Sequence, residues 1–160
     1  MGIIGDDDVE VRAQGWRALT ALHDFIENEL ERALTRRTGL SVVEYTVLDA
    51  LSRQHGRHLR MQQLARASAL SPSATTRLVN RLQERGLLTR IDCLDDRRGI
   101  DAELTTRGHE LLDSARPVHD ETLAAALAEA HGIPELAPLL DALPQLTGEP
   151  MPRSITPPTA

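Results

Sequence analysis

The sequence predicts a mostly α-helical fold that carries a small β-hairpin. The 160 residues are 41% hydrophobic but only 2% aromatic, so the core must be built from Leu, Ala, Val and Ile, which favours helices over sheets. Apolar residues recur at helical spacing along most of the chain, and only residues 87–104 show the alternation that is typical of strands. A chain of this length suits one folded unit.

The first predicted helix runs from Val9 to about Thr38. Arg36 and Arg37 stand near its end and Gly39 lies just beyond, as the helix dipole and C-cap preferences suggest. Its apolar residues form one stripe: Trp16, Leu19, Leu22, Ile26, Leu30 and Leu34. This stripe is long for a helix that packs on one small domain, so we expect part of it to contact a second chain.

A second predicted helix covers Val42 to Arg53, with Ser41 as its N-cap and with three residues facing inward: Tyr45, Leu48 and Leu51. Residues 55–58 then form a link that contains two histidines. No Cys or carboxylate stands at ligand spacing beside them, so we interpret them as exposed polar residues and expect no metal site.

Two short helices are predicted between Met61 and Arg85. Ser71 is a favourable N-cap and Pro72 suits the first helical position, so the second of them begins at Pro72. In the first of them the packing side is expected to be Leu64, Ala65 and Ala69, while Leu70 closes the angle between the two helices.

The helix that begins at Pro72 has two distinct faces. A helical wheel places one polar set together: Ser73, Thr76, Arg77, Asn80 and Glu84. The opposite face holds Thr75, Leu78, Val79 and Leu82 and must pack against the protein. Hydroxyl, amide and guanidinium groups read base edges and bind phosphates in a major groove that admits one helix. The pattern therefore indicates a helix-turn-helix whose second helix recognises DNA.

A hairpin follows this helix. Gly86 stops the helix, Leu87 to Asp92 form a strand, and Ile100 to Leu104 form a second strand in which Asp101 and Glu103 are expected to point outward. The polar turn 93–99 joins them and carries two arginines. Two helices followed by a hairpin with an arginine-bearing tip indicate a winged helix.

The C-terminal part is again helical. Thr105 is expected to cap a long helix that reaches about Ala130 and bends at Pro117. Residues 132–134 break the chain, and Glu135 to Leu146 form a last short helix. The proline-rich tail, residues 148–160, has no periodic core and is expected to be disordered.

Charge is segregated along the chain. The net charge is −6, yet residues 53–98 contain 10 Arg against 4 acidic residues, a local excess of +6. This excess coincides with the predicted DNA-binding segment, and the acidic remainder would be repelled by DNA. A single cysteine, no long apolar run and an acidic N-terminus predict a cytoplasmic protein without a membrane segment or an internal disulfide.

The chain resembles the MarR family of bacterial transcriptional regulators from about residue 40 to residue 108. The residues that carry the resemblance follow the order and spacing of the family: Leu64-Ala65, Leu70-Ser71-Pro72-Ser73, Thr76 to Leu82, Gly86-Leu87, Arg90, Asp96-Arg97-Arg98 and Leu104 to Gly108. It departs from the family at Ala69, where Gly is frequent, and at Ser68, where an apolar residue is usual.

The resemblance implies a dimeric transcriptional regulator. In this interpretation residues 1–38 and 105–147 supply the dimerisation helices, and residues 40–104 form the winged helix-turn-helix. A two-fold dimer presents two recognition helices about 34 Å apart and binds a palindromic operator in double-stranded DNA. The family also implies a repressor that a small aromatic or phenolic effector releases from DNA.

The candidate site residues follow from both arguments. The expected DNA contacts are Ser71, Ser73, Thr75, Thr76, Arg77, Asn80 and Arg81 of the helix, and Arg97 and Arg98 of the wing. Asp96 and Arg90 are expected to orient the wing, and Asp96 with Arg98 matches the family's Asp-x-Arg pattern, in which the acid orients the arginine. An effector site is expected at Arg12, Trp16, Arg17 and His23, unless Trp16 simply packs in the dimer interface.

The sequence also bears on three alternative functions. An enzyme is disfavoured, because the sequence has no phosphate-binding Gly-rich loop, no nucleophile elbow and no paired His ligands, and no cofactor is expected. A winged helix that binds only proteins would not shift a palindromic duplex in a salt-sensitive way. A redox sensor would act through Cys93, but family members that sense oxidants usually carry the cysteine in the first helix.

Overall fold

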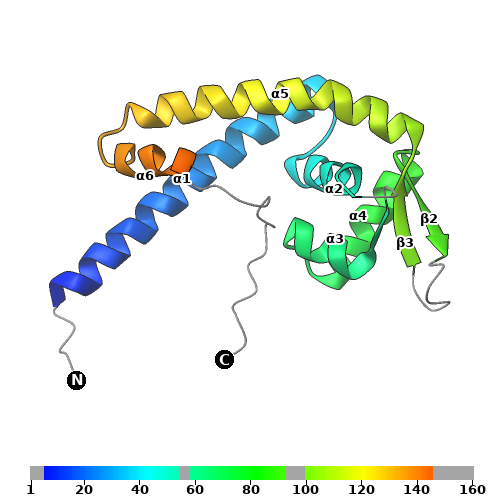
Figure 1. Ribbon diagram of the computed structural model, residues 1–160, viewed down its shortest axis with the longest axis horizontal. Helices are drawn as coiled ribbons and strands as arrows, with labels where there is room; N and C mark the ends of the chain where they lie inside the picture. The colour runs from blue at the N-terminus through cyan, green and yellow to red at the C-terminus, as the bar shows by residue number, and fades with distance from the viewer. Residues whose placement is uncertain (1–5, 55–57, 93–99, 146–160) are drawn as a thin grey trace.

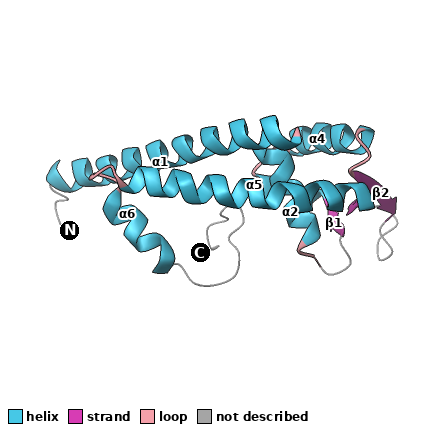
Figure 2. Ribbon diagram, turned by 90° about the horizontal axis from the view of Figure 1, so that it is seen from above, coloured by secondary structure: helices cyan, strands magenta, loops and turns pink. Residues whose placement is uncertain are grey.

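The computed structural model describes residues 6–54, 58–92 and 100–145. Its elements are α1 (Asp6–Thr38), α2 (Val42–Ser52), β1 (His58–Arg60), α3 (Met61–Ser68), α4 (Pro72–Glu84), β2 (Leu88–Asp92), β3 (Ile100–Leu104), α5 (Thr106–His131), α6 (Ala137–Ala142) and a 3-10 turn (Leu143–Gln145). The predicted fold class, mostly helical with a β-hairpin, is confirmed. The long helices α1 and α5 lie side by side, and α2, α3, α4 and the strands gather beside one end of α5 (Figure 1; Figure 2).

The three strands form one antiparallel sheet in the order β1-β3-β2. In this register Ala102 of β3 lies opposite Leu59 on one side and Arg90 on the other. The predicted hairpin is confirmed, with its first strand starting at Leu88 instead of Leu87. Strand β1 was not predicted, because three residues are too few to show an alternating pattern.

Two clusters of buried residues make the core. The main cluster joins the second half of α1 to α2, α3, α4, the sheet and the first half of α5. Its fully buried leucines are Leu34, Leu40, Leu48, Leu51, Leu64, Leu82, Leu87, Leu88 and Leu112. A smaller cluster, formed by Leu22, Ala130, Leu136 and Leu140, holds α6 against α1 and α5. The segment predicted to bind DNA therefore packs into one core with parts of α1 and α5 of the same chain.

The helix starts follow the predicted caps. The hydroxyl groups of Ser41, Ser71 and Thr105 each accept a hydrogen bond from the amide three residues later. Gly39 follows α1 with φ +71°, a left-handed conformation that glycine adopts without strain.

The turn between α3 and α4 differs from the prediction. Ala69 was expected on the packing side, but it is exposed and caps α3 in the left-handed region, with φ 56°. Ser68 is buried in its place, and its hydroxyl donates to the carbonyl oxygen of Leu64 at 2.7 Å. The left-handed conformation of Ala69 turns its side chain away from the core. The hydrogen bond of Ser68 to Leu64 allows this serine to be buried.

The C-terminal helices match the prediction in part. Helix α5 continues through Pro117 to His131, while α6 ends at Ala142, short of the predicted end at Leu146. A 3-10 turn that contains Pro144, Leu143–Gln145, follows α6 directly. The predicted disordered tail lies outside the described residues. Within the described ranges no helix is long and apolar enough to cross a bilayer.

Candidate nucleic-acid interface

Helix α4 presents one polar face to solvent. Ser73, Thr76, Arg77, Asn80 and Glu84 are exposed, whereas Leu78, Val79 and Leu82 are buried in the main cluster. The two faces predicted from the helical wheel are therefore confirmed. Because the apolar face fixes the rotation of the helix, the same five polar residues always point away from the core.

Thr75 does not belong to this exposed face. Its side chain is 1% exposed, and its hydroxyl donates to the carbonyl oxygen of Ser71 at 3.0 Å. The sequence-based assignment of Thr75 as a DNA contact is therefore wrong, since a packed and internally bonded hydroxyl does not reach a ligand. Ser71 and Ser73 remain at the exposed start of the helix, where their hydroxyl oxygens lie 3.3 Å apart.

The two arginines of the helix differ in their partners. Within the described part of the chain, Arg77 makes no hydrogen bond or ion pair, so its guanidinium is available to a ligand. The Nε of Arg81 donates to Oε1 of Glu44 at 2.9 Å. Arg81 is therefore attached to α2 while half of its side chain is exposed.

Glu44 holds the recognition helix in place. Its carboxylate is buried and accepts hydrogen bonds from the Ser41 amide at 3.0 Å, from Arg81 and from Nη1 of Arg85 at 3.0 Å. Burial alone would raise the pKa of Glu44, but the Ser41 amide and the two arginines outweigh it and hold that pKa below its ordinary value. Arg85 also donates to the carbonyl oxygen of Gly39. The carboxylate of Glu44 thus connects the start of α2 with the end of α4, and Arg85 connects both with the residue that follows α1.

Arg90 contacts the recognition helix from strand β2. It donates from Nη2 to Oδ1 of Asn80 at 2.5 Å and from Nη1 to Oε1 of Gln83 at 2.8 Å. Its partners among the described residues thus lie on α4, and the expected role of Arg90 in orienting the wing stays a prediction, because the wing tip lies outside them. No local signal marks this contact, because the partners are separated by a turn and by seven or ten residues.

The wing tip lies outside the described residues, and with it Cys93, Asp96, Arg97 and Arg98. The strands that lead to it are described. Asp101 of β3 was expected to point outward but is 4% exposed, and its Oδ2 lies 3.8 Å from Nε2 of His58. Its burial follows from the position of β3 as the central strand, where β1 covers a side that a two-stranded hairpin would leave open.

The four residues expected to bind an effector are all exposed in the described part of the chain. Trp16 is 68% exposed, Arg17 is paired with Glu10, Arg12 donates to the carbonyl oxygen of Asp8, and His23 lies beside Asp24. All four lie on the part of α1 that extends beyond the main cluster (Figure 1). In a single chain they form an open helix surface.

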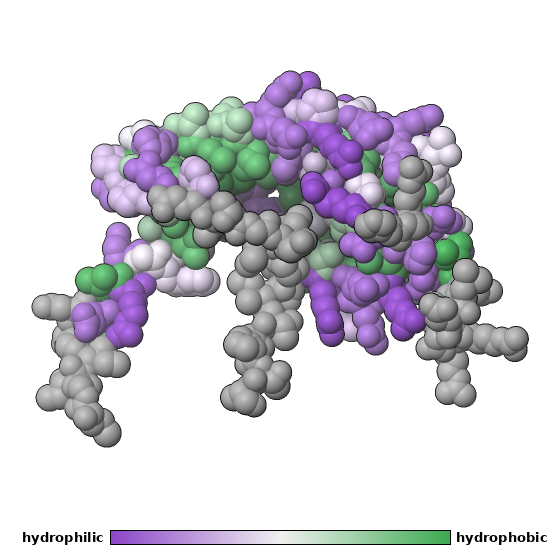
Figure 3. All heavy atoms as spheres, viewed as in Figure 1, coloured by the Kyte–Doolittle hydropathy of each residue, from purple (hydrophilic) through white to green (hydrophobic). Residues whose placement is uncertain are grey.

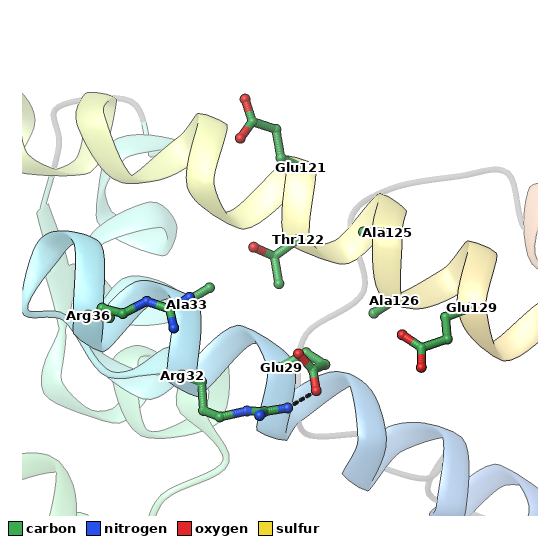
Figure 4. Close-up of a pocket in the computed structure, with 9 residues that line it drawn as sticks. All are labelled: Glu29, Arg32, Ala33, Arg36, Glu121, Thr122, Ala125, Ala126 and Glu129. Atoms are coloured by element: carbon green, nitrogen blue, oxygen red, sulfur yellow. Dashed lines mark hydrogen bonds and ion pairs between the residues drawn. The ribbon is translucent and has the colours of Figure 1, made fainter.

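A cavity of about 310 Å³ lies between α1 and α5. In Figure 4, Thr122 and Ala126 point from α5 toward α1, and Arg32 is paired with Glu29 on the opposite wall. The lining residues include Arg36 and two further carboxylates, Glu121 and Glu129. The mixed charges suit a polar small molecule, although none of the residues expected to bind an effector lies here.

Helix α5 is attached to the DNA-binding segment through α2. The ring of His119 stacks on Tyr45, with ring centroids 4.4 Å apart, and Arg116 donates to the hydroxyl of Ser52 at 2.7 Å. Burial, with a smaller contribution from Asp49, raises the pKa of Tyr45 to about 12, so this ring stays neutral. A movement of α5 would therefore reach α2 through side chains that are in contact.

Comparison with known proteins gives consistent results. Residues 38–99 match the sequence model of the MarR family. The chain is 28% identical over 124 residues to YkoM of Bacillus subtilis, an HTH-type transcriptional regulator (65% of this chain, 79% of that protein), and 32% identical over 91 residues to the HTH-type transcriptional repressor MdtR of the same organism (57% of each). It is also similar to the crystal structure of the MarR family regulator Sco3205 from Streptomyces coelicolor in complex with DNA, with TM-score 0.71 and 29% identity over 91% of this chain and 88% of that one.

Proposed function

The chain belongs to the MarR family of transcriptional regulators, and we propose that it acts as a homodimer that binds a palindromic operator in double-stranded DNA. The observation that carries the proposal is the exposed face of α4. This face combines Arg77, which has no partner among the described residues, with the exposed side chains of Ser73, Thr76 and Asn80, and the buried face behind it fixes the rotation of the helix. Such a helix suits the major groove.

The dimer is supported by the apolar residues that one chain leaves exposed. Val9, Val11, Trp16 and Leu19 are 46–70% exposed along one half of α1. Figure 3 shows hydrophobic side chains on this projecting end of the helix. Several large apolar side chains exposed on one segment favour an interface there. We therefore assign residues 1–38 and 105–147 to dimerisation, and residues 40–104 to DNA binding.

We further propose that the protein is a cytoplasmic repressor, and that a small aromatic or phenolic effector releases it from DNA. The contacts of α5 with α2 support a route by which changes between the long helices could move α4. Arg12, Trp16, Arg17 and His23 would form an effector site only with a partner chain beside them. The cavity between α1 and α5 is the other candidate location.

The wing completes the proposed interface. We propose, from the Asp-x-Arg pattern of the family, that Asp96 orients Arg98 into the minor groove beside the half-site and that Arg97 is a further DNA contact. A narrow minor groove attracts arginine, so binding should favour A·T-rich flanks, and Arg98→Ala should abolish that preference.

The test of this function is a mobility-shift titration of wild type and Arg77→Ala against an operator duplex and a random duplex. A bidentate base contact is worth about 1–3 kcal/mol, so Arg77→Ala should weaken operator binding about 5- to 150-fold and weaken random binding far less. Arg36→Ala removes the same charge from α1 and serves as the control. No salt-sensitive shift of any duplex by the wild type would favour a winged helix that binds proteins.

A further inference from the structure

Arg90 determines which atoms of two α4 side chains are free. A guanidinium group has only donors, so the amide atom that meets it must be the oxygen. Arg90 therefore occupies Oδ1 of Asn80 at 2.5 Å and Oε1 of Gln83 at 2.8 Å. Turning either amide over would break a charge-assisted hydrogen bond.

Arg90 thus takes one of the two lone pairs of Oδ1, while the Nδ2 group of Asn80 donates to none of the described residues and is free for a ligand. Asn80 is exposed on the proposed DNA face, in the same set as Arg77. An unrestrained asparagine reads adenine with both ends of its amide: the oxygen accepts from N6 and the nitrogen donates to N7. This pairing would bring the adenine N6 donor against an oxygen that already accepts from Arg90, beside a cationic group that presents only further N–H donors.

We propose that Asn80 reads guanine as a hydrogen-bond donor and that Arg90 is the positioning residue that imposes this choice. The inference rests on the proposed DNA-binding function and names the base recognised at that site. Guanine offers two adjacent acceptors in the major groove, N7 and O6. Adenine would place its N6 amino group against the Asn80 amino group, cytosine offers only a donor, and thymine offers one acceptor beside a methyl group.

The first experiment identifies the contacted base. Wild type selects its site from a randomised duplex pool, and single-base binding profiles are then measured for wild type and Asn80→Ala. The position whose preference disappears in Asn80→Ala should be a guanine. Replacing it with 7-deazaguanine, which lacks the N7 acceptor, should weaken wild type about three- to tenfold and leave Asn80→Ala unchanged. Inosine keeps N7 and O6 and is the matched control, with no expected change in either protein.

The second experiment removes the hydrogen bond from Arg90 that fixes the orientation of the Asn80 amide. Arg90→Ala frees Oδ1 of Asn80, so the preference at that position should move from guanine toward adenine. Gln83→Ala removes only the other hydrogen bond of Arg90 and should keep the guanine preference. Thermal unfolding of each variant checks that it is folded, and if Arg90→Ala unfolds, the 7-deazaguanine comparison still decides.

Adenine at the wild-type position, insensitivity to 7-deazaguanine, or an unchanged guanine preference in a folded Arg90→Ala would each overturn the inference. If Asn80→Ala weakened DNA binding equally whatever the base at that position, Asn80 would be a phosphate contact. This result would also overturn the inference. Enrichment of no sequence by the wild type would instead refute the proposed function, and the inference with it.

Discussion

Helix α4 and the first half of α1 have similar sequence patterns but different surroundings. Both carry an apolar stripe at helical spacing, yet Leu78, Val79 and Leu82 are at most 3% exposed, while Trp16 is 68% exposed and Leu19 is 46% exposed. Periodicity shows that a face must be covered, and it does not show whether the same chain covers it. The stripe of α1 becomes buried only from Leu22 onward, where α5 and α6 lie against it.

This difference limits which residues belong to dimerisation alone. Leu30, Ala33 and Leu34 lie in the same cluster as the core of the DNA-binding segment. A truncation through Leu34 would therefore damage both regions at once. Substitutions before Leu22 change the proposed dimer interface without touching the main cluster.

The largest expected effect is that of Leu82→Ala in α4. Leu82 is fully buried, so the substitution leaves a cavity and should lower the free energy of unfolding by about 2–5 kcal/mol. Leu19→Ala makes the same chemical change on the exposed part of α1. Under dilute conditions in which the chain is monomeric, it should change the urea midpoint little. An equal loss in the two variants would show that the first half of α1 is packed within the chain.

The second prediction concerns a residue on the exposed first half of α1, where a substitution should affect dimerisation more than folding. Trp16→Ser removes a large apolar side chain from the proposed interface and should weaken dimerisation by about 1.5–3 kcal/mol, or roughly 10- to 150-fold in the dissociation constant. Sedimentation equilibrium measures it. The far-UV circular dichroism spectrum of the variant should match that of the wild type, because Trp16 is exposed in the single chain. A dimer as tight as that of the wild type would place the interface elsewhere.

The third prediction concerns the junction of α5 with the hairpin. A Cβ added at Gly108 would overlap the backbone carbonyl oxygen of Leu87, which is not the end of a flexible side chain. Gly108→Ala should therefore cost about 1–3 kcal/mol, because the backbone must move. Chemical denaturation measures the loss. A variant as stable as the wild type would mean that the start of α5 can shift freely relative to the sheet.

The sequence predicted the parts of this structure that depend on local signals. Ser71 with Pro72 located the start of α4, Thr105 located that of α5, and alternation located β3. The polar face of α4 followed from periodicity alone. Thr75 was assigned to the wrong group, because a hydroxyl at a helix start resembles a ligand-binding group until its burial is known.

The parts that were missed depend on contacts between distant segments. The bonds from Glu44 to Arg81 and Arg85 span 37 and 41 residues, and nothing near Glu44 in the sequence predicts that its carboxylate is buried. The contact of Arg90 with Asn80 and Gln83 was likewise not predicted, because only the packing of β2 against α4 brings these residues together.

The fourth prediction uses the lowered pKa of Glu44. A carboxylate with a lowered pKa in the folded state contributes stability above its unfolded pKa of about 4.5, and this contribution is lost as the pH falls through the folded pKa. Glu44→Gln should cost about 1 kcal/mol at pH 7, and the difference from wild type should shrink below pH 4.5. Urea titrations at several pH values measure it. A difference that is constant from pH 7 to pH 3 would show that the charge of Glu44 adds nothing.

The smallest expected effect returns to the exposed half of α1. Gly15 lies inside the helix with nothing within 4 Å of an added Cβ, so Gly15→Ala should stabilise α1 by about 0.5–1 kcal/mol. Few tertiary contacts hold this segment, so helix propensity decides how often it opens, and amide exchange around residue 15 should slow about two- to fivefold in the variant. Within a dimer the outcome also locates the interface. If Gly15→Ala slows exchange and leaves dimerisation unchanged, Gly15 faces solvent in the dimer, whereas a weaker dimer would mean that the partner chain packs closely against its backbone.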